Sequence, residues 1–166
     1  MIVVVMGVTG AGKTTVGQLL AQELRWEFAD ADSFHSPSNV EKIRQGIPLD
    51  DADRAPWLAA LRRAIENWIA ERKNEVLACS ALKKSYRDEL SVGGEVQFVY
   101  LKGSYDLIYQ RLLARHGHFA SEKILASQFA DLEEPIDALI VDIDAPPEKI
   151  VAAIRRGLGL DHDQAV

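Results

Sequence analysis

A glycine-rich stretch, GVTGAGKTT at residues 7–15, directly follows the apolar run IVVVM and precedes an amphipathic segment. It matches the pattern G-x-x-x-x-G-K-[ST], in which glycines let backbone N–H groups approach phosphate oxygens. Those groups and the N-terminus of the next helix form an anion nest, while Lys13 reaches the β- and γ-phosphates and Thr14 ligates Mg²⁺. The motif predicts a nucleoside triphosphate site formed by Gly7, Val8, Thr9, Gly10, Ala11, Gly12, Lys13, Thr14 and Thr15.

Strand and helix patterns alternate along the chain. The predicted strands are short and apolar, as in strands covered on both faces, and they are residues 2–6, 27–30, 75–79, 96–101 and 138–142. Helical periodicity appears in residues 13–24, 56–73, 104–115 and 146–159. This alternation predicts a parallel sheet with right-handed crossovers. We therefore expect a three-layer α/β/α fold around a five-stranded parallel sheet, in a single domain of residues 1–166.

Charge and cysteine content exclude several classes of partner. The net charge of the 166 residues is −6, the pI is about 5.2, and no long block of Lys or Arg occurs. Broad binding to nucleic acids or membrane surfaces depends on concentrated positive potential, so neither partner is expected. Cys79, the one cysteine, lies in an apolar run and is expected to be a buried strand residue rather than a nucleophile. The default location is the cytoplasm, since no signal segment or membrane span is apparent.

The class of P-loop protein follows from what accompanies the motif. A GTPase switch would also carry an N-K-x-D guanine-binding sequence, which this sequence lacks, and 166 residues are few for a motor. A compact small-molecule kinase fits best. Its acceptor would bind beyond the carboxyl ends of the strands, at the switch point of the sheet.

Two aspartates follow the second predicted strand at that edge. Asp30 and Asp32 stand two residues apart, so in extended backbone both carboxylates face the same region. Opposite a P-loop, one of them can bind the water shell of Mg²⁺ while the other orients or deprotonates an acceptor hydroxyl. Asp30 is a candidate for the metal role, with Thr14, and Asp32 for the hydroxyl role, but the spacing alone does not decide which aspartate takes which role. The alternative that an aspartate only caps the following turn stays open, above all for Asp30.

Two arginines in a later helical segment are candidates for the phosphate side. Arg111 and Arg115 are spaced i, i+4 and therefore share one helix face. We expect Arg111 to stack on the nucleotide base and Arg115 to contact the transferring phosphoryl group. Gly117 then breaks the helix and His118 begins a mobile flap, which predicts a lid over about residues 116–130. The alternative is a basic, solvated helix face.

Five segments occur in order along the chain: GVTGAGKTT, DADSFHSPSNVEKIRQGIPLDDADRAPWL, CSALKKSYRDEL, YLKGSYDLIYQRLLARHGHF and VDID. Together they closely resemble the gluconokinase family, over nearly the whole chain from Val4 to about Asp144. Related small kinases of the shikimate and adenylate type share the glycine-rich loop and a lid arginine but lack the later segments. Residues 119–134 match more loosely, apart from Gln128 and Phe129.

The resemblance implies ATP-dependent phosphorylation of D-gluconate with Mg²⁺ as cofactor, in a P-loop kinase fold with a substrate-binding helical hairpin and a lid. The acceptor would lie between the second-strand acids, a helical region of about residues 33–72 and the CSALKK segment. Asp32 would bind the acceptor hydroxyl with His35 beside it, and His118 and Gln128 would contact the substrate from the lid. The family's dimeric habit suggests a homodimer.

A carboxylate with many hydroxyls needs a cationic fork in its pocket. Arg54 is the best clamp, because a guanidinium binds a carboxylate through two hydrogen bonds. Its alternative role is that of a helix-start arginine paired with Asp50 or Asp51. Lys83 and Arg87 share a helix face in the segment after the third strand, and we expect at least one of them, Lys83 first, to point to the anion.

The remaining assignments leave alternatives open. His35 is either a neutral hydrogen-bond partner for a sugar hydroxyl or a turn histidine, and Lys42 serves either the site or the helix surface. Lys13, Asp32 and Arg115 form the predicted catalytic set. The rival functions are a kinase of the same fold for another hydroxy acid, such as shikimate or another aldonate, and a nucleotide-binding module without phosphoryl transfer.

Overall fold

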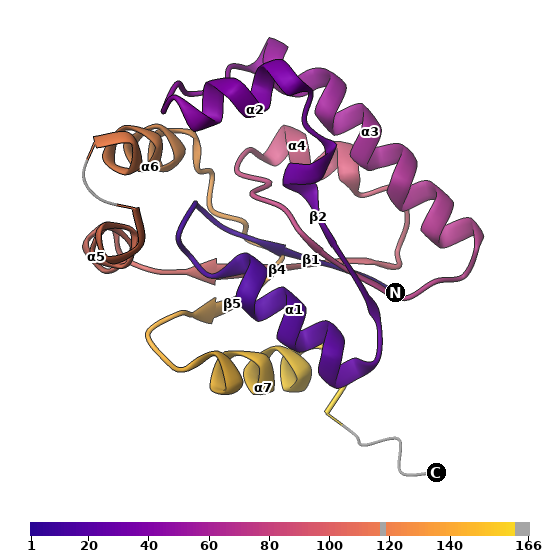
Figure 1. The fold of residues 1–166 in the computed structure, drawn as a ribbon. Coiled ribbons are helices and arrows are strands. Elements are labelled where there is room, and N and C mark those ends of the chain that lie inside the picture. Colours follow the sequence, from indigo (N-terminus) through magenta and orange to yellow (C-terminus); the bar gives the residue numbers. More distant parts are fainter. Residues whose placement is uncertain (117–118, 162–166) are drawn as a thin grey trace.

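Five parallel strands form one sheet in the computed structural model, which describes residues 1–116 and 119–161 (Figure 1). They lie in the order β2-β3-β1-β4-β5, so β1 is central. Their bounds are Ile2–Met6 (β1), Glu27–Asp30 (β2), Glu75–Ala78 (β3), Val96–Lys102 (β4) and Leu139–Asp142 (β5). The predicted strands are confirmed, with one end of β3, β4 and β5 moved by a single residue.

Helices connect the strands. Within the described residues they are α1 Lys13–Leu24, the 3-10 helix η1 Ala31–Phe34, α2 Pro37–Arg44, α3 Asp51–Ala70, α4 Lys84–Leu90, α5 Tyr105–His116, α6 Phe119–Asp131 and α7 Pro147–Gly157. In that part of the chain, every helix is too short or too polar to span a membrane.

The sheet is covered on both faces. Val3 and Val5 of β1 pack into an apolar cluster with side chains of α1, α5 and α7. Ile2 and Val4, which alternate with them, pack into a second cluster with side chains of α3 and α4. Figure 1 shows α1 and α7 on one side of the sheet and α3 and α4 on the other. The strands are apolar throughout because both faces are buried, and the predicted three-layer α/β/α fold is confirmed.

The strand register brings the ends of three strands to one edge of the sheet. Ala78 of β3 pairs with Val5 of β1 on one side and with Asp30 of β2 on the other. The P-loop leaves the sheet just after Val5, and η1 leaves it just after Asp30. The Gly7 N–H donates to the carbonyl of Ser80, 3.3 Å away, which ties the loop after β1 to the loop after β3. Phosphate-binding and acidic residues far apart in sequence therefore emerge side by side.

Helix α3 begins earlier than its apolar stripe indicates. The sequence pattern starts at Pro56, whereas the helix starts at Asp51. The side chain of Asp50 accepts a hydrogen bond from Asp53 N at 2.7 Å, and the Asp53 side chain accepts one from Asp50 N at 3.1 Å. This reciprocal capping box satisfies free N–H groups of the first turn, so the helix extends over a polar stretch.

The segment predicted as a lid contains a helix, α6, which packs against α5 (Figure 1). The Tyr105 ring of α5 lies 5.3 Å from the Phe129 ring of α6 and 5.9 Å from the Tyr109 ring, between centroids. The Tyr105–Phe129 contact joins the two helices, while the Tyr105–Tyr109 contact lies within α5. Gly117 and His118, the predicted glycine break and the start of the flap, lie outside the described residues.

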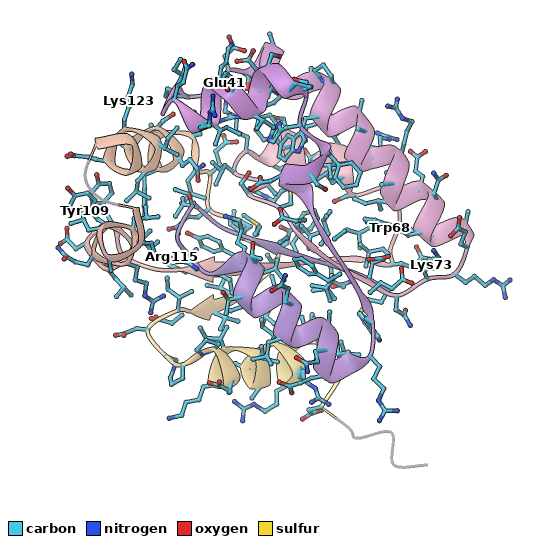
Figure 2. The ribbon with its side chains drawn as sticks, in the orientation of Figure 1. Glu41, Trp68, Lys73, Tyr109, Arg115 and Lys123 are labelled. Carbon is cyan, nitrogen blue, oxygen red and sulfur yellow. The ribbon has the colours of Figure 1, made fainter. Side chains whose placement is uncertain are left out.

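A buried carboxyl group lies at the opposite end of the sheet. Glu75 is 3% exposed, pairs in register with Glu27, and its Oε2 has no hydrogen-bond partner within the described residues. Burial, followed by the neighbouring Glu27 carboxylate, raises the pKa of Glu75 to about 7, although Lys73 opposes the shift. Figure 2 shows Lys73 at this end, in the turn that leads into β3. Glu75 therefore keeps its proton in the folded protein where an unfolded chain would lose it.

We predict that stability falls as pH rises from about 4.5 through about 7, because unfolding releases the Glu75 proton in this window. Glu75→Gln cannot ionise, so it should unfold at higher denaturant concentration than the wild type at pH 8. The gain is at most about 3 kcal/mol, the linkage equivalent of raising the pKa from 4.5 to about 7. The difference should shrink toward zero near pH 4.5.

The matched control is Glu66→Gln, which removes an exposed carboxylate that pairs with Arg62 on the surface of α3. It should leave the pH dependence of unfolding unchanged. If Glu75→Gln loses stability between pH 5 and 8 as steeply as the wild type, Glu75 is not the titrating group.

Candidate active site

The P-loop requires glycine at two positions where the backbone is left-handed. Gly10 has φ +80°, and a Cβ there would lie 2.8 Å from Leu112 Cγ, so any side chain would collide with α5. Gly12 has φ +96° and caps the start of α1. Lys13 Nζ crosses the loop and donates to the carbonyl of Val8 at 3.0 Å. Burial lowers the pKa of Lys13, while the nearby carboxylates of Asp32 and Asp30 oppose the shift. The ammonium group and the two carboxylates thus lie close enough to influence one another.

Asp30 joins the P-loop to the acidic segment. Its Oδ2 accepts a hydrogen bond from Thr14 Oγ1 at 3.2 Å, and its Oδ1 accepts one from Asp32 N at 2.9 Å. Asp30 therefore caps the turn that follows and also contacts the predicted metal-ligating hydroxyl of Thr14, while its metal role stays a prediction. The Asp32 carboxylate makes no side-chain hydrogen bond within the described residues and lines a cavity in front of Lys13.

This cavity, which we call the central cavity, gathers predicted residues from both the P-loop and the acceptor side. It lies between the P-loop, η1, α3 and α6, and six predicted residues contribute to its wall, namely Thr9, Lys13, Asp32, His35, Arg54 and Gln128. Apolar side chains of Trp57 and Leu82 complete the floor. A phosphate-binding lysine, an acidic side chain, an imidazole and a guanidinium thus face one space, which suits transfer of a phosphoryl group to an anionic hydroxy compound.

His35 is held by an aromatic neighbour. Its ring stacks on Trp57 with centroids 4.5 Å apart and an interplanar angle of 12°. Trp57 is itself fixed, because its Nε1–H donates to the carbonyl of Ala31 at 2.7 Å. Burial, with a further contribution from Arg54, lowers the pKa of His35 although Asp32 opposes it, so the imidazole is neutral at pH 7.

Arg54 pairs with a distant acid rather than with its helical neighbours. Its side chain is buried, and Nη1 donates to Asp131 Oδ2 at the end of α6 and to Tyr86 Oη, both at 3.0 Å. Asp50 instead caps α3, and Asp51 accepts from Tyr86 and Lys83. The local pairing that the sequence left open is therefore wrong. Within the described residues the Nε and Nη2 donors of Arg54 make no hydrogen bond.

The structure does not bring Lys83 or Arg87 to the central cavity. Lys83 precedes α4 and its Nζ donates to Asp51 Oδ1 at 2.9 Å. Arg87 is buried and donates to the backbone carbonyls of Ala81, Leu82 and Glu133. The expectation that Lys83 or Arg87 points to the substrate anion is therefore not met by this geometry. Lys83 lies at the N-cap of α4 and Arg87 within the helix, and each side chain already has another partner.

Two further lysines also have structural partners. Lys84 Nζ donates to Asp88 Oδ2 at 2.8 Å on the surface of α4. Lys42 Nζ contacts both carboxylate oxygens of Asp53 at 2.9 and 3.0 Å, which fastens α2 to the start of α3. Lys42 therefore does not line the cavity, and its side chain joins two helices instead of extending alone from the surface of α2.

Cys79 is buried directly after β3, as the sequence predicts. Burial raises the pKa of its thiol to about 12, so the thiol is protonated at neutral pH and does not act as a nucleophile.

Comparisons with known proteins find small-molecule kinases, with gluconokinases among the relatives of high identity. A family model described as shikimate kinase matches residues 9–156. The thermoresistant gluconokinase of Escherichia coli K12 is 46% identical over 157 residues, which cover 92% of this chain and 90% of the relative. The gluconokinase of Gluconobacter oxydans 621H is 47% identical over 136 residues, covering 81% of this chain and 76% of that protein. A crystal structure of a gluconokinase from Sinorhizobium meliloti 1021 matches with a TM-score of 0.85 and 40% identity, covering 95% of this chain and 90% of that one.

The chain belongs to the gluconokinase family. The two gluconokinase relatives cover 92% and 81% of this chain, so the resemblance seen in the sequence is confirmed. The chain is accordingly a kinase that binds a nucleotide, and the glycine-rich loop stays the predicted site for it.

A second hollow beside the P-loop fits the nucleotide of such a kinase. Gly12 and Thr15 contribute to its lining from the P-loop and α1, and Arg111 and Arg115 contribute from α5. Arg115 is labelled in Figure 2. Arg111 Nη2 donates to the carbonyl of Ile143 at 2.8 Å, which holds its guanidinium at the mouth of the hollow. The two arginines therefore face the P-loop, rather than open solvent alone, and their individual roles stay predictions.

The residues around Thr14 fit a magnesium ion. The hydroxyl of Thr14 and the carboxylate of Asp30 are in contact, and both offer hard oxygen ligands. An ion that arrives with nucleotide phosphates needs only one or two protein ligands of this kind.

Sequence analysis missed several partners of the site residues. Asp131 holds Arg54, and Trp57, one of the apolar residues of α3, supports His35. Gln128 was predicted to contact substrate, and here its Oε1 accepts a hydrogen bond from Thr9 N at 2.5 Å. This contact links α6 directly to the P-loop. Asn39 is a further partner, of His35. The i, i+4 spacing of His35 and Asn39 in HSPSN was a usable signal for this contact.

We predict that Gln128→Ala accelerates hydrogen exchange of the Thr9 amide several-fold in the ligand-free protein, because that amide loses its acceptor. Exchange would be followed by NMR or by mass spectrometry of P-loop peptides. Gln97→Ala is the control, since Gln97 is an exposed glutamine of β4 that contacts only Gly94. Equal Thr9 exchange in both variants would show that α6 does not protect the P-loop.

Proposed function

We propose that this chain catalyses ATP-dependent phosphorylation of D-gluconate at its terminal hydroxyl, giving 6-phospho-D-gluconate and ADP. The observation that carries the proposal is the central cavity, in which Lys13 of the P-loop lies opposite Asp32 and Arg54. A module that only binds a nucleotide has no use for an acid and a guanidinium on the acceptor side. The gluconokinases that match this chain over most of its length support the choice of acceptor.

Transfer is proposed to run in line from the γ-phosphate to the acceptor oxygen. Lys13 and Arg115 stabilise the charge on the transferring group, and Asp32 aligns the hydroxyl and accepts its proton late. Because such transition states are loose, positioning contributes more than the basicity of Asp32. Mg²⁺, held by Thr14 and the water shell beside Asp30, would neutralise charge on the β- and γ-phosphate oxygens.

Arg54 is proposed to bind the gluconate carboxylate. Asp131 and Tyr86 both take hydrogen bonds from Nη1, which leaves Nε and Nη2 of the guanidinium for two further bonds. Two parallel N–H donors match the two oxygens of a carboxylate. The same pair of partners fixes the plane of the fork, so little side-chain entropy is lost when the substrate binds.

Two segments are proposed to complete the acceptor site. Residues 33–72, with α2 and α3, would bind gluconate, and residues 116–130 would act as a lid over it. Gln128 and Ile124 of α6 already contribute to the cavity wall. Closure would exclude water, which favours transfer to gluconate over hydrolysis of ATP. We also propose that His118 contacts the substrate. The protein is further proposed to form a homodimer and to act in the cytoplasm, as expected from the sequence.

The proposal is tested by acceptor-dependent ADP release. The enzyme is supplied with Mg·ATP and, in parallel, with gluconate, shikimate, other aldonates or no acceptor, and ADP is measured by a coupled assay. Gluconate should give the highest kcat/KM and the acceptor-free rate should be small. A preference for shikimate or another aldonate would make this a kinase for that acid, and ATP binding without acceptor-dependent release would make it a binding module.

We predict that Asp32→Asn lowers kcat with gluconate by about 10²–10⁴-fold, the range for loss of a positioned general base, while ATP affinity is retained. Steady-state kinetics and ATP titration measure the two quantities. Asp88→Asn, on the outer surface of α4, is the control and should be as active as the wild type. Near-normal turnover of Asp32→Asn would remove this residue from the mechanism.

A further inference from the structure

A buried amide lies behind His35. Asn39 is 5% exposed and sits on α2, four residues after His35. Its Nδ2 donates to the backbone carbonyl of Asp53 at 2.8 Å and lies 3.3 Å from His35 Nδ1. Asn39 is not part of the cavity wall, and His35 is the cavity residue whose side chain it contacts.

The carbonyl of Asp53 determines which way the Asn39 amide faces. A backbone carbonyl can only accept, so the atom that contacts it must be the NH₂ group and not the amide oxygen. The same nitrogen is the atom next to His35 Nδ1, and it has a second hydrogen to donate. His35 Nδ1 must therefore offer a lone pair, and a neutral imidazole with a lone pair on Nδ1 carries its proton on Nε2.

The imidazole is neutral and firmly placed. The groups that act on it are Asp32 from η1, Arg54 and Trp57 from α3, and Asn39 from α2. Burial lowers the pKa of His35, which keeps one nitrogen unprotonated at pH 7. Nε2 has no hydrogen-bond partner among the described residues, yet it is not fully buried. It is the polar atom of the ring left free for a ligand.

The position of Asn39 is fixed from several sides. Its backbone N–H donates to Ser36 Oγ, the N-cap of α2, at 3.2 Å. The Lys42–Asp53 ion pair ties α2 to α3, so the Asp53 carbonyl stays within reach of Asn39. The contacts of Asn39 with His35 and Ser36 are therefore local in sequence. Its third partner, the Asp53 carbonyl, belongs to α3 and is kept in place by the ion pair with Lys42.

We propose that Asn39 is a positioning residue that holds His35 in the Nε2-protonated tautomer, so that His35 donates a hydrogen bond to a hydroxyl oxygen of the acceptor. The acceptor role rests on the proposed function, whereas the tautomer does not. A hydroxyl between Asp32 and His35 has one proton, which it gives to the Asp32 carboxylate, and a lone pair, which accepts from Nε2–H. The opposite tautomer would offer this hydroxyl two acceptors and leave one unsatisfied.

The first measurement is the tautomer itself, read from long-range ¹H–¹⁵N correlation spectra of the ¹⁵N-labelled, ligand-free protein. The chain has 4 histidines, and loss of one signal set in His35→Gln assigns His35. We expect Nε2–H in the wild type, a mixture of tautomers in Asn39→Leu, and Nδ1–H in Asn39→Asp, whose carboxylate can only accept. Nδ1–H in the wild type would overturn the proposal even if neither Asn39 variant folds.

The second measurement is kinetic. Asn39→Leu should raise KM for gluconate by about 3- to 10-fold, the equivalent of one hydrogen bond, with KM for ATP unchanged. Ser38→Ala, at the neighbouring position on α2, is the control and should change neither KM nor the tautomer, since within the described residues the Ser38 hydroxyl hydrogen-bonds to Ser36 and not to His35 or Asn39. If the wild type is Nε2–H but KM for gluconate does not respond to Asn39→Leu, the positioning role is wrong while the kinase function stands. If gluconate is not a substrate at all, the proposed function fails and the tautomer result is unaffected.

Discussion

The register of β1, β3 and β2 is the constraint on which the site depends. Ala78 pairs with Val5 and Asp30, so the loop that binds phosphate and the turn that carries Asp32 leave the sheet at neighbouring points. A shift of one residue in either pairing would move the carboxylates by about 3.3 Å and reverse the faces to which side chains point. The apolar residues buried on both faces hold the register. The positions of the P-loop and of the Asp32 carboxylate therefore depend on the packing of the sheet.

The electrostatic arrangement explains how an acidic chain can bind two anionic substrates. The net charge is −6, yet Lys13 and Arg54 face one cavity and Arg111 and Arg115 face the adjoining hollow. Many other cations pair with acids on the surface, as Lys84 and Asp88 illustrate. Cations are thus gathered where phosphates and a carboxylate are proposed to bind, and ion pairs such as Lys42–Asp53 keep the acceptor helices in place.

Local patterns predicted the fold and the phosphate side of the site, and long-range contacts account for what they missed. β1, the P-loop and α1 are contiguous, so periodicity and the glycine motif suffice to place Lys13 and Thr14. The fate of Arg54, in contrast, depends on Asp131, 77 residues away, and Arg87 is occupied by the carbonyl of Glu133, 46 residues away. No spacing rule within one helix contains those partners. The start of α3 was missed for a different reason: a capping box extends the helix beyond its apolar stripe.

The central claim, that the phosphoryl group passes to the terminal hydroxyl of gluconate, is tested most directly by proton-coupled ³¹P NMR of the enzyme with Mg·ATP and gluconate. We expect the γ-phosphate signal to fall and one phosphomonoester signal to rise, split into a triplet because the ester oxygen is attached to a CH₂ group. A doublet would mean transfer to a secondary hydroxyl. Inorganic phosphate in place of an ester would mean that water is the acceptor, and either result would contradict the assignment of Asp32 and the central cavity to gluconate phosphorylation.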